Sequence, residues 1–374
     1  MLKVLISSHA YVVAINQQKL ELLGSLSEVS LSLLVPESWK AALRETNLEK
    51  STDPNYEIHS LPIFFNGNND RFFYPIFSLL KLFSKLKPDL VHIEEEPWSF
   101  ACLQLNLFAK VFGAKTIFFT WENLYREHRP WYSLVEKINL SFSHAAVAGN
   151  TQAKEILEKR GFKKEILVLP QLGVNQQTFQ KKKESVLANQ LGLKDFVIGY
   201  FGRLEEQKGL RDLIAVFKKL KFPAQLLIIG SGPLKEWLKK EAEINKRIIY
   251  PGVINHSEIP AYFNLLDVFV LPSRTTSVWK EQFGHVLIEA MASGVPVLGS
   301  SSGAIPEVIG GAGLIFQEGD VEDLAQKITL LSQNKSLIES LSQKGLDRVK
   351  DFYTQEKIAQ KTFKFYQTIA KVRP

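Results

Sequence analysis

Residues 197–230 read VIGYFGRLEEQKGLRDLIAVFKKLKFPAQLLIIG and predict a strand, a helix and a second strand in succession. An apolar run over 197–201 is followed by a glycine turn, an amphipathic segment over 210–220 and a second apolar run over 225–229. Because parallel neighbours need a crossover of about this length, the order predicts two parallel strands joined by a helix.

The same alternation continues on both sides of this segment. Runs without polar alternation are typical of strands that are buried on both faces of a parallel sheet. The sequence therefore predicts an α/β protein. Further strands are expected at 4–7, 29–35, 90–93, 116–120, 145–148, 166–169, 248–250, 268–271 and 295–298, and the helices between them at 16–26, 77–86, 103–112, 234–244, 258–266 and 284–292.

The alternation is interrupted at residues 172–187, LGVNQQTFQKKKESVL, which are polar and lack periodicity. We interpret this segment as a linker between two domains, which fits 374 residues at about 150 per domain. The predicted domains are 1–172 and 173–354, and a final helix within 355–374 is expected to pack back on the first. Two Rossmann-like domains facing each other across a cleft would bind ligands beyond the carboxyl ends of their strands.

The composition excludes several classes of protein. Apolar residues make up 45% and charged residues 23%, as in soluble globular proteins. The single cysteine, Cys102, excludes a disulfide framework or a cysteine-built zinc site and fits a reducing compartment. No segment approaches the ~18 uninterrupted apolar residues of a membrane span, and MLKVLISSHAYVV is too strand-like for a signal peptide. We expect a cytoplasmic protein.

The net charge is +7, from 46 Lys and Arg against 39 Asp and Glu. It favours anionic partners, such as nucleic acid, an anionic membrane face or phosphorylated substrates, or contributes only to solubility. The loop Gly202–Gly209 brings Arg203 and Lys208 to one turn after a strand. These two cations would suit a diphosphate, since Arg grips phosphate oxygens as a fork and Lys acts as a point charge. The alternative is an exposed basic loop.

Two further glycine turns follow predicted strands. Gly230 and Gly232 precede Pro233, where the first amides of a helix can face an anion, although a plain tight turn explains them equally. Val253 ends the segment Pro251–Val253, which could meet a flat ring or be only a turn.

The strongest motif is EQFGHVLIEAMASGVPV, residues 281–297. Glu289 lies within an apolar helix, where a carboxylate is costly unless it accepts hydrogen bonds, for example from ribose hydroxyls. Glu281 precedes the helix and could accept from sugar hydroxyls, and the amides at 283–285 would face a phosphate. A structural salt bridge is the alternative for either glutamate. The residues of this motif that we assign to the donor are Phe283, Gly284, His285 and Glu289.

These segments, together with GRLEEQKGL, IIGSGP, PGV, VFVLPS and SSSGAIPEVI, resemble the retaining nucleotide-sugar glycosyltransferases of the GT-B fold, glycosyltransferase family 4. The resemblance is dense over 197–309 and extends over the whole chain in architecture. It implies that Arg203 and Lys208 hold the donor diphosphate, that Glu281 meets the donor sugar and that Glu289 meets the ribose. It makes 1–172 the acceptor side and 173–354 the domain that binds the nucleotide sugar.

The resemblance implies transfer of a sugar from a nucleoside diphosphate to an acceptor hydroxyl with retention, in polysaccharide, glycolipid or surface-glycan synthesis. Charge developing on the diphosphate would be stabilised by Arg203, Lys208 and helix amides. No Asp-x-Asp occurs in the chain, so we expect neither a metal nor another cofactor. The acceptor would be a glycan, a lipid-linked or a small molecule, and no nucleic acid partner is expected. The alternatives are a UDP-sugar epimerase of related fold and a catalytically silent scaffold.

The first domain departs from the family pattern. Many members carry His-Asp after the strand equivalent to 116–120, where this chain has Trp121-Glu122. Glu122, or His9 at the end of the first strand, would take over a catalytic role, although a packed loop histidine explains His9 equally. The acidic run Glu94–Glu96 would bind acceptor hydroxyls or a cation, or be a solvated loop.

An aromatic and basic segment, Phe72–Lys87, is the last feature of the first domain. It would touch an anionic membrane face and bring the protein to the inner face of the membrane, or form a core helix with a lysine-bearing outer face.

Overall fold

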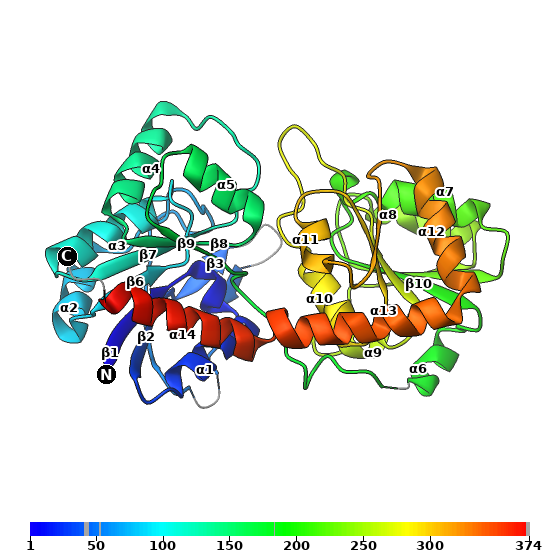
Figure 1. Ribbon diagram of the computed structural model, residues 1–374, viewed down its shortest axis with the longest axis horizontal. Helices are drawn as coiled ribbons and strands as arrows, with labels where there is room; N and C mark the ends of the chain where they lie inside the picture. Colours follow the sequence, from blue (N-terminus) through cyan, green and yellow to red (C-terminus); the bar gives the residue numbers. More distant parts are fainter. Residues whose placement is uncertain (41–44, 52–53, 183, 372–374) are drawn as a thin grey trace. The chain divides into compact units, whose positions relative to one another are not determined.

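The computed structural model describes residues 1–40, 45–51, 54–182 and 184–371 (Figure 1). The chain forms two compact units, of which unit 1 is Met1–Gly173 with Gln355–Pro374 and unit 2 is Val174–Thr354. The boundary lies one residue after the predicted one. Each unit holds a parallel sheet with helices on both faces, so the predicted α/β class with two Rossmann-like domains is confirmed.

The sheet of unit 1 has seven parallel strands. The order runs outward from β1 in one direction and then from β6 in the other, so the switch point of the sheet lies between β1 and β6. In spatial order the strands are β5 (Glu57–Leu61), β2 (Val29–Pro36), β1 (Leu2–Ser7), β6 (Leu90–Ile93), β7 (Lys115–Thr120), β8 (Ala145–Ala148) and β9 (Glu165–Val168).

Alternate side chains of β1 enter two separate cores. Val4 and Ile6 pack with α1 (Gln18–Gly24) and α14 (Gln355–Lys371), which lie together in Figure 1. Leu5 packs on the opposite face. Residues 372–374 of the predicted final helix lie outside the described residues. The helices of the opposite face are α2 (Ile76–Leu86), α3 (Phe100–Val111), α4 (Pro130–Phe142) and α5 (Thr151–Lys159).

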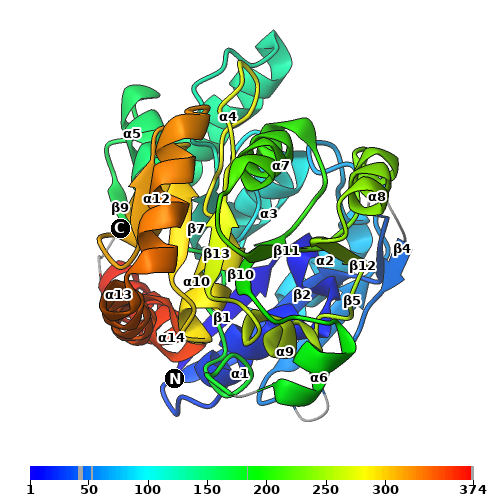
Figure 2. The ribbon, with the colours of Figure 1, turned by 90° about the vertical axis from the view of Figure 1, so that its right-hand side faces the viewer.

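Unit 2 repeats this plan with six parallel strands, and its switch point lies between β10 and β13. In Figure 2 the strands pass between α7 (Leu210–Lys219) above and α9 (Ile259–Phe263) below. In spatial order the strands are β12 (Ile248–Gly252), β11 (Ala224–Ile229), β10 (Phe196–Phe201), β13 (Val268–Leu271), β14 (Val297–Ser300) and β15 (Leu314–Phe316). The other helices of unit 2 are α6 (Ser185–Gln190), α8 (Lys235–Ile244), α10 (His285–Ala292), α11 (Ile305–Ile309), α12 (Val321–Gln333) and α13 (Lys335–Arg348).

Several elements are absent from the sequence-based prediction. Among them are β5, the short hairpin of β3 (Ser38–Lys40) and β4 (Glu45–Asn47), and the segment from β15 to α13. The predicted linker contains the start of α6, and its residue 183 lies outside the described residues. No described helix combines the length and apolar composition needed to cross a membrane.

Candidate functional site

The glycine turns of unit 2 pack backbone against backbone at the carboxyl end of its sheet. The amide of Leu204 donates to the carbonyl of Ser231 over 2.9 Å, and the amide of Gly230 donates to the carbonyl of Gly252 over 2.9 Å. A Cβ atom at Gly230 would overlap the carbonyl oxygen of Gly202. The turns after β10, β11 and β12 therefore form one surface, which includes Gly202, Gly230 and Gly232 and admits no side chain at position 230.

Lys208 and Glu281 meet at the switch point of unit 2. Lys208 Nζ lies 2.8 Å from Glu281 Oε2, and Ser273 Oγ donates to the same oxygen over 2.8 Å. The lysine also lies over the ring of Trp279, 4.5 Å from its centroid. The salt bridge that the sequence left open for Glu281 is present, and its partner is another predicted site residue.

The loop after β14 holds the backbone of Glu281 in place. The amide of Ala304 donates to the carbonyl of Glu281 over 2.9 Å. Gly303 has φ +54° and packs so closely that a Cβ atom there would overlap this carbonyl oxygen. Gly303 therefore fixes the backbone of Glu281, the residue whose carboxylate pairs with Lys208.

Two histidines contact the buried carboxylate of Glu289 on α10. His285 Nδ1 lies 3.2 Å and His256 Nε2 3.4 Å from Glu289 Oε1. Burial raises the pKa of Glu289, but hydrogen bonds from His256 and His285 outweigh it and lower the pKa to about 2. The sequence analysis missed His256, whose only signal is its position just beyond the end of β12, three residues after Val253.

The remaining predicted donor residues of unit 2 differ in exposure. Arg203 points outward, with a side chain that is 72% exposed and paired with Glu205, so the structure does not bring it to the Lys208–Glu281 pair. Val253 is exposed. Phe283 is buried and its ring lies 5.6 Å from that of Tyr353, so its side chain packs inside unit 2. Gly284 is the N-cap of α10.

In unit 1 His9 and Glu95 form a tight pair across the switch point. His9 follows β1 and Glu95 follows β6, and both the backbone amide and Nδ1 of His9 lie 2.8 Å from Glu95 Oε1. Burial lowers the pKa of His9, but the charge and hydrogen bond of Glu95 outweigh it and raise the pKa above 6.5. The ring of His9 lies 4.4 Å from that of Trp39, so the histidine is positioned on two sides.

The neighbours of Glu95 are also held inside unit 1. Glu94 accepts from Lys19 Nζ over 2.5 Å and from the Tyr11 hydroxyl over 2.6 Å. Glu96 accepts from Thr120 Oγ1 over 2.6 Å, and burial raises its pKa to about 8. The interpretation of this run as a solvated loop is wrong, because Glu94 and Glu95 are buried.

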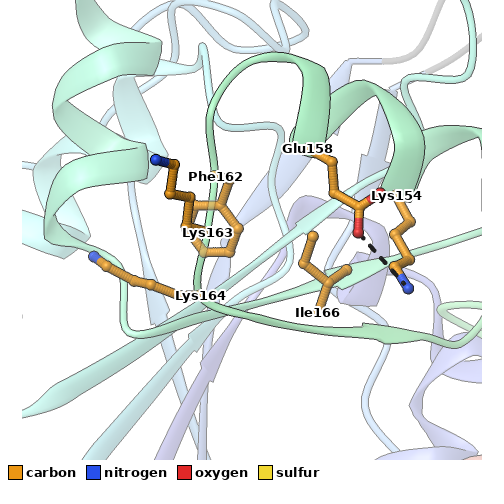
Figure 3. Close-up of a pocket in the computed structure, with 6 residues that line it drawn as sticks. All are labelled: Lys154, Glu158, Phe162, Lys163, Lys164 and Ile166. Atoms are coloured by element: carbon orange, nitrogen blue, oxygen red, sulfur yellow. Dashed lines mark ion pairs between the residues drawn. The ribbon is translucent and has the colours of Figure 1, made fainter.

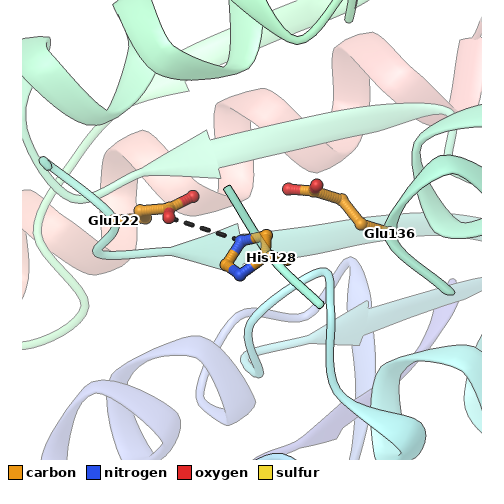
Figure 4. A group of neighbouring side chains, drawn as sticks. All are labelled: Glu122, His128 and Glu136. Carbon is orange, nitrogen blue, oxygen red and sulfur yellow. Dashed lines mark ion pairs between the residues drawn. The ribbon is translucent and has the colours of Figure 1, made fainter. Parts of the chain in front are cut away.

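Glu122 lies in a separate buried cluster, where it turns toward His128 and Glu136 (Figure 4). Arg160 binds both carboxylates, with Nη2 3.0 Å from Glu122 Oε2 and Nη1 2.9 Å from Glu136 Oε2, and Nη2 lies 3.1 Å from His128 Nε2. Burial raises the pKa of Glu136 even so. Although the three side chains have metal-ligand spacing, Arg160 already supplies a positive charge to both carboxylates. The structure thus gives Glu122 a role in holding the loop after β7.

A cavity of about 360 Å³ lies before β9, at the amino end of the strand (Figure 3). Lys164 Nζ donates to the carbonyl oxygen of Ser141 over 2.6 Å at the end of α4. This cavity lies at the opposite end of the sheet from His9 and is not a candidate site. Its lining residues are Lys154, Glu158, Phe162, Lys163, Lys164 and Ile166.

Comparison with known proteins finds a family match that lies within unit 2. Residues 181–348 match the family model described as glycosyl transferases group 1. The chain is 33% identical over 187 residues to the capsular polysaccharide biosynthesis glycosyltransferase CapM of Staphylococcus aureus, a match that covers 47% of each protein. The chain spans about half the length of the curated relatives it matches.

Solved structures with this architecture extend over the whole chain. The sucrose-phosphate synthase from Thermosynechococcus elongatus has a TM-score of 0.74 at 20% identity and covers 99% of both chains. HepE of Anabaena in complex with UDP has a TM-score of 0.74 at 15% identity and covers 98% of this chain and 100% of that one. The fold is therefore that of GT-B glycosyltransferase structures.

Proposed function

We propose that this protein is a glycosyltransferase that moves a sugar from a nucleoside-diphosphate sugar to an acceptor hydroxyl, with retention of configuration as in glycosyltransferase family 4. The observation that carries the proposal is the Lys208–Glu281 pair at the switch point of unit 2, within a segment that matches a glycosyltransferase model. CapM in capsular polysaccharide synthesis and HepE with bound UDP support the donor class and a role in polysaccharide, glycolipid or surface-glycan assembly.

In this proposal the charge of the leaving diphosphate is stabilised by the protein and not by a metal or another cofactor. Lys208 supplies a point charge, and the amides of the packed glycine turns lie at the same end of the sheet. Arg203, whose side chain is exposed, joins them by exchanging its ion pair with Glu205 for a phosphate. Glu281 accepts from the sugar, and the acceptor oxygen attacks on the face that the diphosphate leaves.

Glu289 recognises the ribose in the same proposal. Its lowered pKa keeps the carboxylate ionised at every physiological pH, and an ionised carboxylate accepts hydrogen bonds from both hydroxyls of a diol. His285 and His256 hold Oε1, which orients the group before a ligand arrives. Val253 lies beside the base. On the acceptor side we propose His9, positioned by Glu95, as the group that meets the acceptor hydroxyl.

We place the reaction in the cytoplasm, at the inner face of a membrane, with a glycan, lipid-linked or small-molecule acceptor and no nucleic acid. The aromatic and lysine-bearing segment at the start of α2 supports the membrane contact.

The first test is a thermal shift of the native protein with UDP, GDP, ADP, TDP and CMP. A diphosphate at 100 times its Kd adds about 2.7 kcal/mol to the free energy of unfolding, or roughly 5–10 °C in Tm. We expect one base to give a clear shift that is lost in Glu289→Ala. The matched control is Glu236→Ala, which removes an exposed carboxylate of α8 and should leave the shift unchanged.

No shift with any of the nucleotides would contradict the donor class and favour a silent scaffold. Where a base is identified, release of the diphosphate from its sugar nucleotide is then measured with Glu281→Ala as the inactive variant. Conversion of the donor to an epimer without release of the diphosphate would make the protein an epimerase.

A further inference from the structure

Large apolar side chains are exposed at one end of unit 1. They come from three segments of the chain, namely the loop after β5, the first turn of α2 and the first five residues of α4. These side chains are between 52 and 85% exposed, and Phe77 is the most exposed of them. We call this set the apolar rim, and its members are Phe64, Phe65, Ile76, Phe77, Trp131 and Leu134.

The first part of the rim lies at the carboxyl end of the sheet. β5 runs parallel to β2 and ends at Leu61, so the loop that follows starts at the carboxyl end. The amide of Phe64 donates to the carbonyl of Phe73 over 3.0 Å, which ties this loop to the residues just before α2. Because α2 connects β5 to the parallel strand β6, its first turn, with Ile76 and Phe77, is at the same end.

The second part of the rim is linked to the first. α4 also begins after a strand, β7, so Trp131 in its first turn lies at the carboxyl end as well. Arg71 Nε donates to the hydroxyl of Tyr132 over 3.1 Å, which connects the loop before α2 to the start of α4. Phe100 at the start of α3 lies 6.4 Å from the ring of Trp131. The starts of the three helices thus share one aromatic edge.

The exposed face of α2 changes character along its length. Leu79, Leu82 and Phe83 fill the core, so Ile76 and Phe77 are not needed for the packing of the helix. Lysines follow on the exposed side, with Lys81 about 6 Å and Lys85 about 12 Å along the helix from Phe77 at 1.5 Å per residue.

These lysines are left with little compensating charge. Lys85 Nζ lies 3.6 Å from Glu57, and both side chains of that pair are well exposed. Lys81 has no carboxylate within 4.0 Å among the described residues.

We propose that the apolar rim enters the surface of a bilayer that contains anionic lipids, with Lys81, Lys85 and Lys87 against the headgroups. Phe and Trp are the side chains favoured at the boundary between headgroups and acyl chains, and lysines near that boundary are attracted to anionic lipids. The apolar residues at the start of α2 would meet the acyl chains, and the lysines further along the helix would meet the anionic headgroups. This is the order in which the two layers of a bilayer surface lie. Contact with another protein alone would not require apolar residues at the start of α2 and lysines behind them.

The rim is close to the proposed acceptor side. The ring of Phe72 lies 6.0 Å from that of His9, and Phe72 adjoins Phe73 in the tied loop. A bilayer at the rim would therefore bring a lipid-linked hydroxyl to the end of the sheet that carries His9. This reason for the contact rests on the proposed function, whereas the contact itself is a property of the surface.

The test is sedimentation of the full chain with vesicles of phosphatidylcholine, with and without phosphatidylglycerol, at low and high salt. We expect binding only with phosphatidylglycerol. Ile76→Ser with Phe77→Ser should weaken it about tenfold or more. Lys81→Gln with Lys87→Gln should reduce its salt dependence. The matched control is Val186→Ser with Ile244→Ser, which removes two exposed apolar side chains of unit 2 and should leave binding unchanged.

The inference is overturned if the native chain does not sediment with anionic vesicles at low salt, or if the rim variant binds as well as the native chain. It is also overturned if the native chain is a dimer by ultracentrifugation and the rim variant is a monomer, because a second copy then covers the rim. Nucleotide-induced thermal shifts are measured on the same variants. A retained shift without vesicle binding removes this inference and the membrane location but leaves the proposed sugar transfer, and vesicle binding without any shift removes the proposed sugar transfer but leaves this inference.

Discussion

The two units have the same sheet plan but use their switch points differently. In unit 2 the switch point is lined by glycine turns, and Lys208 and Glu281 reach it from loops. In unit 1 it is filled by side chains that bind one another, such as Glu94 with Lys19 and His9 with Glu95. Backbone amides and a single ion pair can exchange partners for a ligand, whereas a buried network of carboxylates is costly to disturb.

Charged residues at the carboxyl ends of the two sheets therefore differ in their partners. In unit 1 the charged side chains at the edge of the sheet bind several neighbours each, whereas in unit 2 Lys208 and Glu281 form one pair, which we propose to open for the donor. Variants that remove one cation or one close contact in each unit separate these roles.

The largest effect is expected from Arg160→Met in unit 1. Arg160 is the cation shared by the buried carboxylates of Glu122 and Glu136, and its removal takes the guanidinium from both and leaves His128 as the neighbour of Glu122. Breaking a buried pair of this kind costs about 3–5 kcal/mol of unfolding free energy. Chemical denaturation should show this loss, while the nucleotide-induced thermal shift, a property of unit 2, persists.

The matched control is Arg211→Met, which removes an arginine from an exposed ion pair with Glu206. Its Tm should stay close to that of the native protein, because exposed pairs contribute little. If Arg160→Met is as stable as Arg211→Met, the cluster around Glu122 is not structural and its catalytic role is open again.

A smaller loss of stability is expected from Gly303→Ala in unit 2, together with loss of nucleotide binding. Gly303 has φ +54° and packs on the carbonyl of Glu281, so a Cβ atom must displace the backbone of that residue. We expect a loss of about 3 kcal/mol, from the left-handed conformation and the overlap together. Differential scanning fluorimetry with and without nucleotide measures both effects.

Gly192→Ala is the control for Gly303→Ala. Gly192 has φ +66° but nothing within 4 Å of a Cβ atom, so only the conformational cost of about 1–2 kcal/mol remains. Equal losses in the two variants would mean that contact with Glu281 does not matter, and unchanged nucleotide binding in Gly303→Ala would separate this loop from the site.

The same difference explains what the sequence could predict. The site in unit 2 is encoded locally, because each glycine turn directly follows an apolar strand and the pair Glu281 and Glu289 lies on one short segment. The network in unit 1 joins residues far apart in the chain, 86 positions for His9 and Glu95 and 75 for Lys19 and Glu94. No spacing rule connects such residues, so the positions at strand ends pointed only to His9 and Glu94–Glu96, and Lys19 on α1 was missed.

The missed elements have a similar cause. β5 reads EIHSL and lies at the edge of the sheet, where no side chain is fully buried, so it lacks the apolar run that marks the central strands. For the segment Phe72–Lys87 the core alternative holds at Leu79 and Phe83, which are buried, but not at Phe77, which is exposed, and the membrane contact stays a prediction.

The smallest effect, and the most specific test of the unit 1 network, is the pH dependence of Glu95→Gln. The charge of Glu95 holds the pKa of His9 above 6.5, so the pair stabilises the fold fully below pH 6.5 and loses this contribution as pH rises through the raised pKa. In the variant burial alone acts, and the pKa of His9 should fall below 6.5. The difference in unfolding free energy between native and variant should therefore be larger at acid than at alkaline pH, by about 1.4 kcal/mol per unit of pKa change.

The control for this prediction is the same substitution in a His9→Gln background, where the titrating imidazole is absent. There Glu95→Gln should change the unfolding free energy by an amount that does not depend on pH between 5 and 9 in denaturant titrations (a range of about two units on either side of a histidine pKa). If the pH dependence persists without His9, another group titrates against Glu95. The imidazole would then not be the partner that the carboxylate positions, and the case for His9 at the acceptor hydroxyl would lose its physical basis, because that case depends on Glu95 fixing Nδ1 and leaving Nε2 for the acceptor.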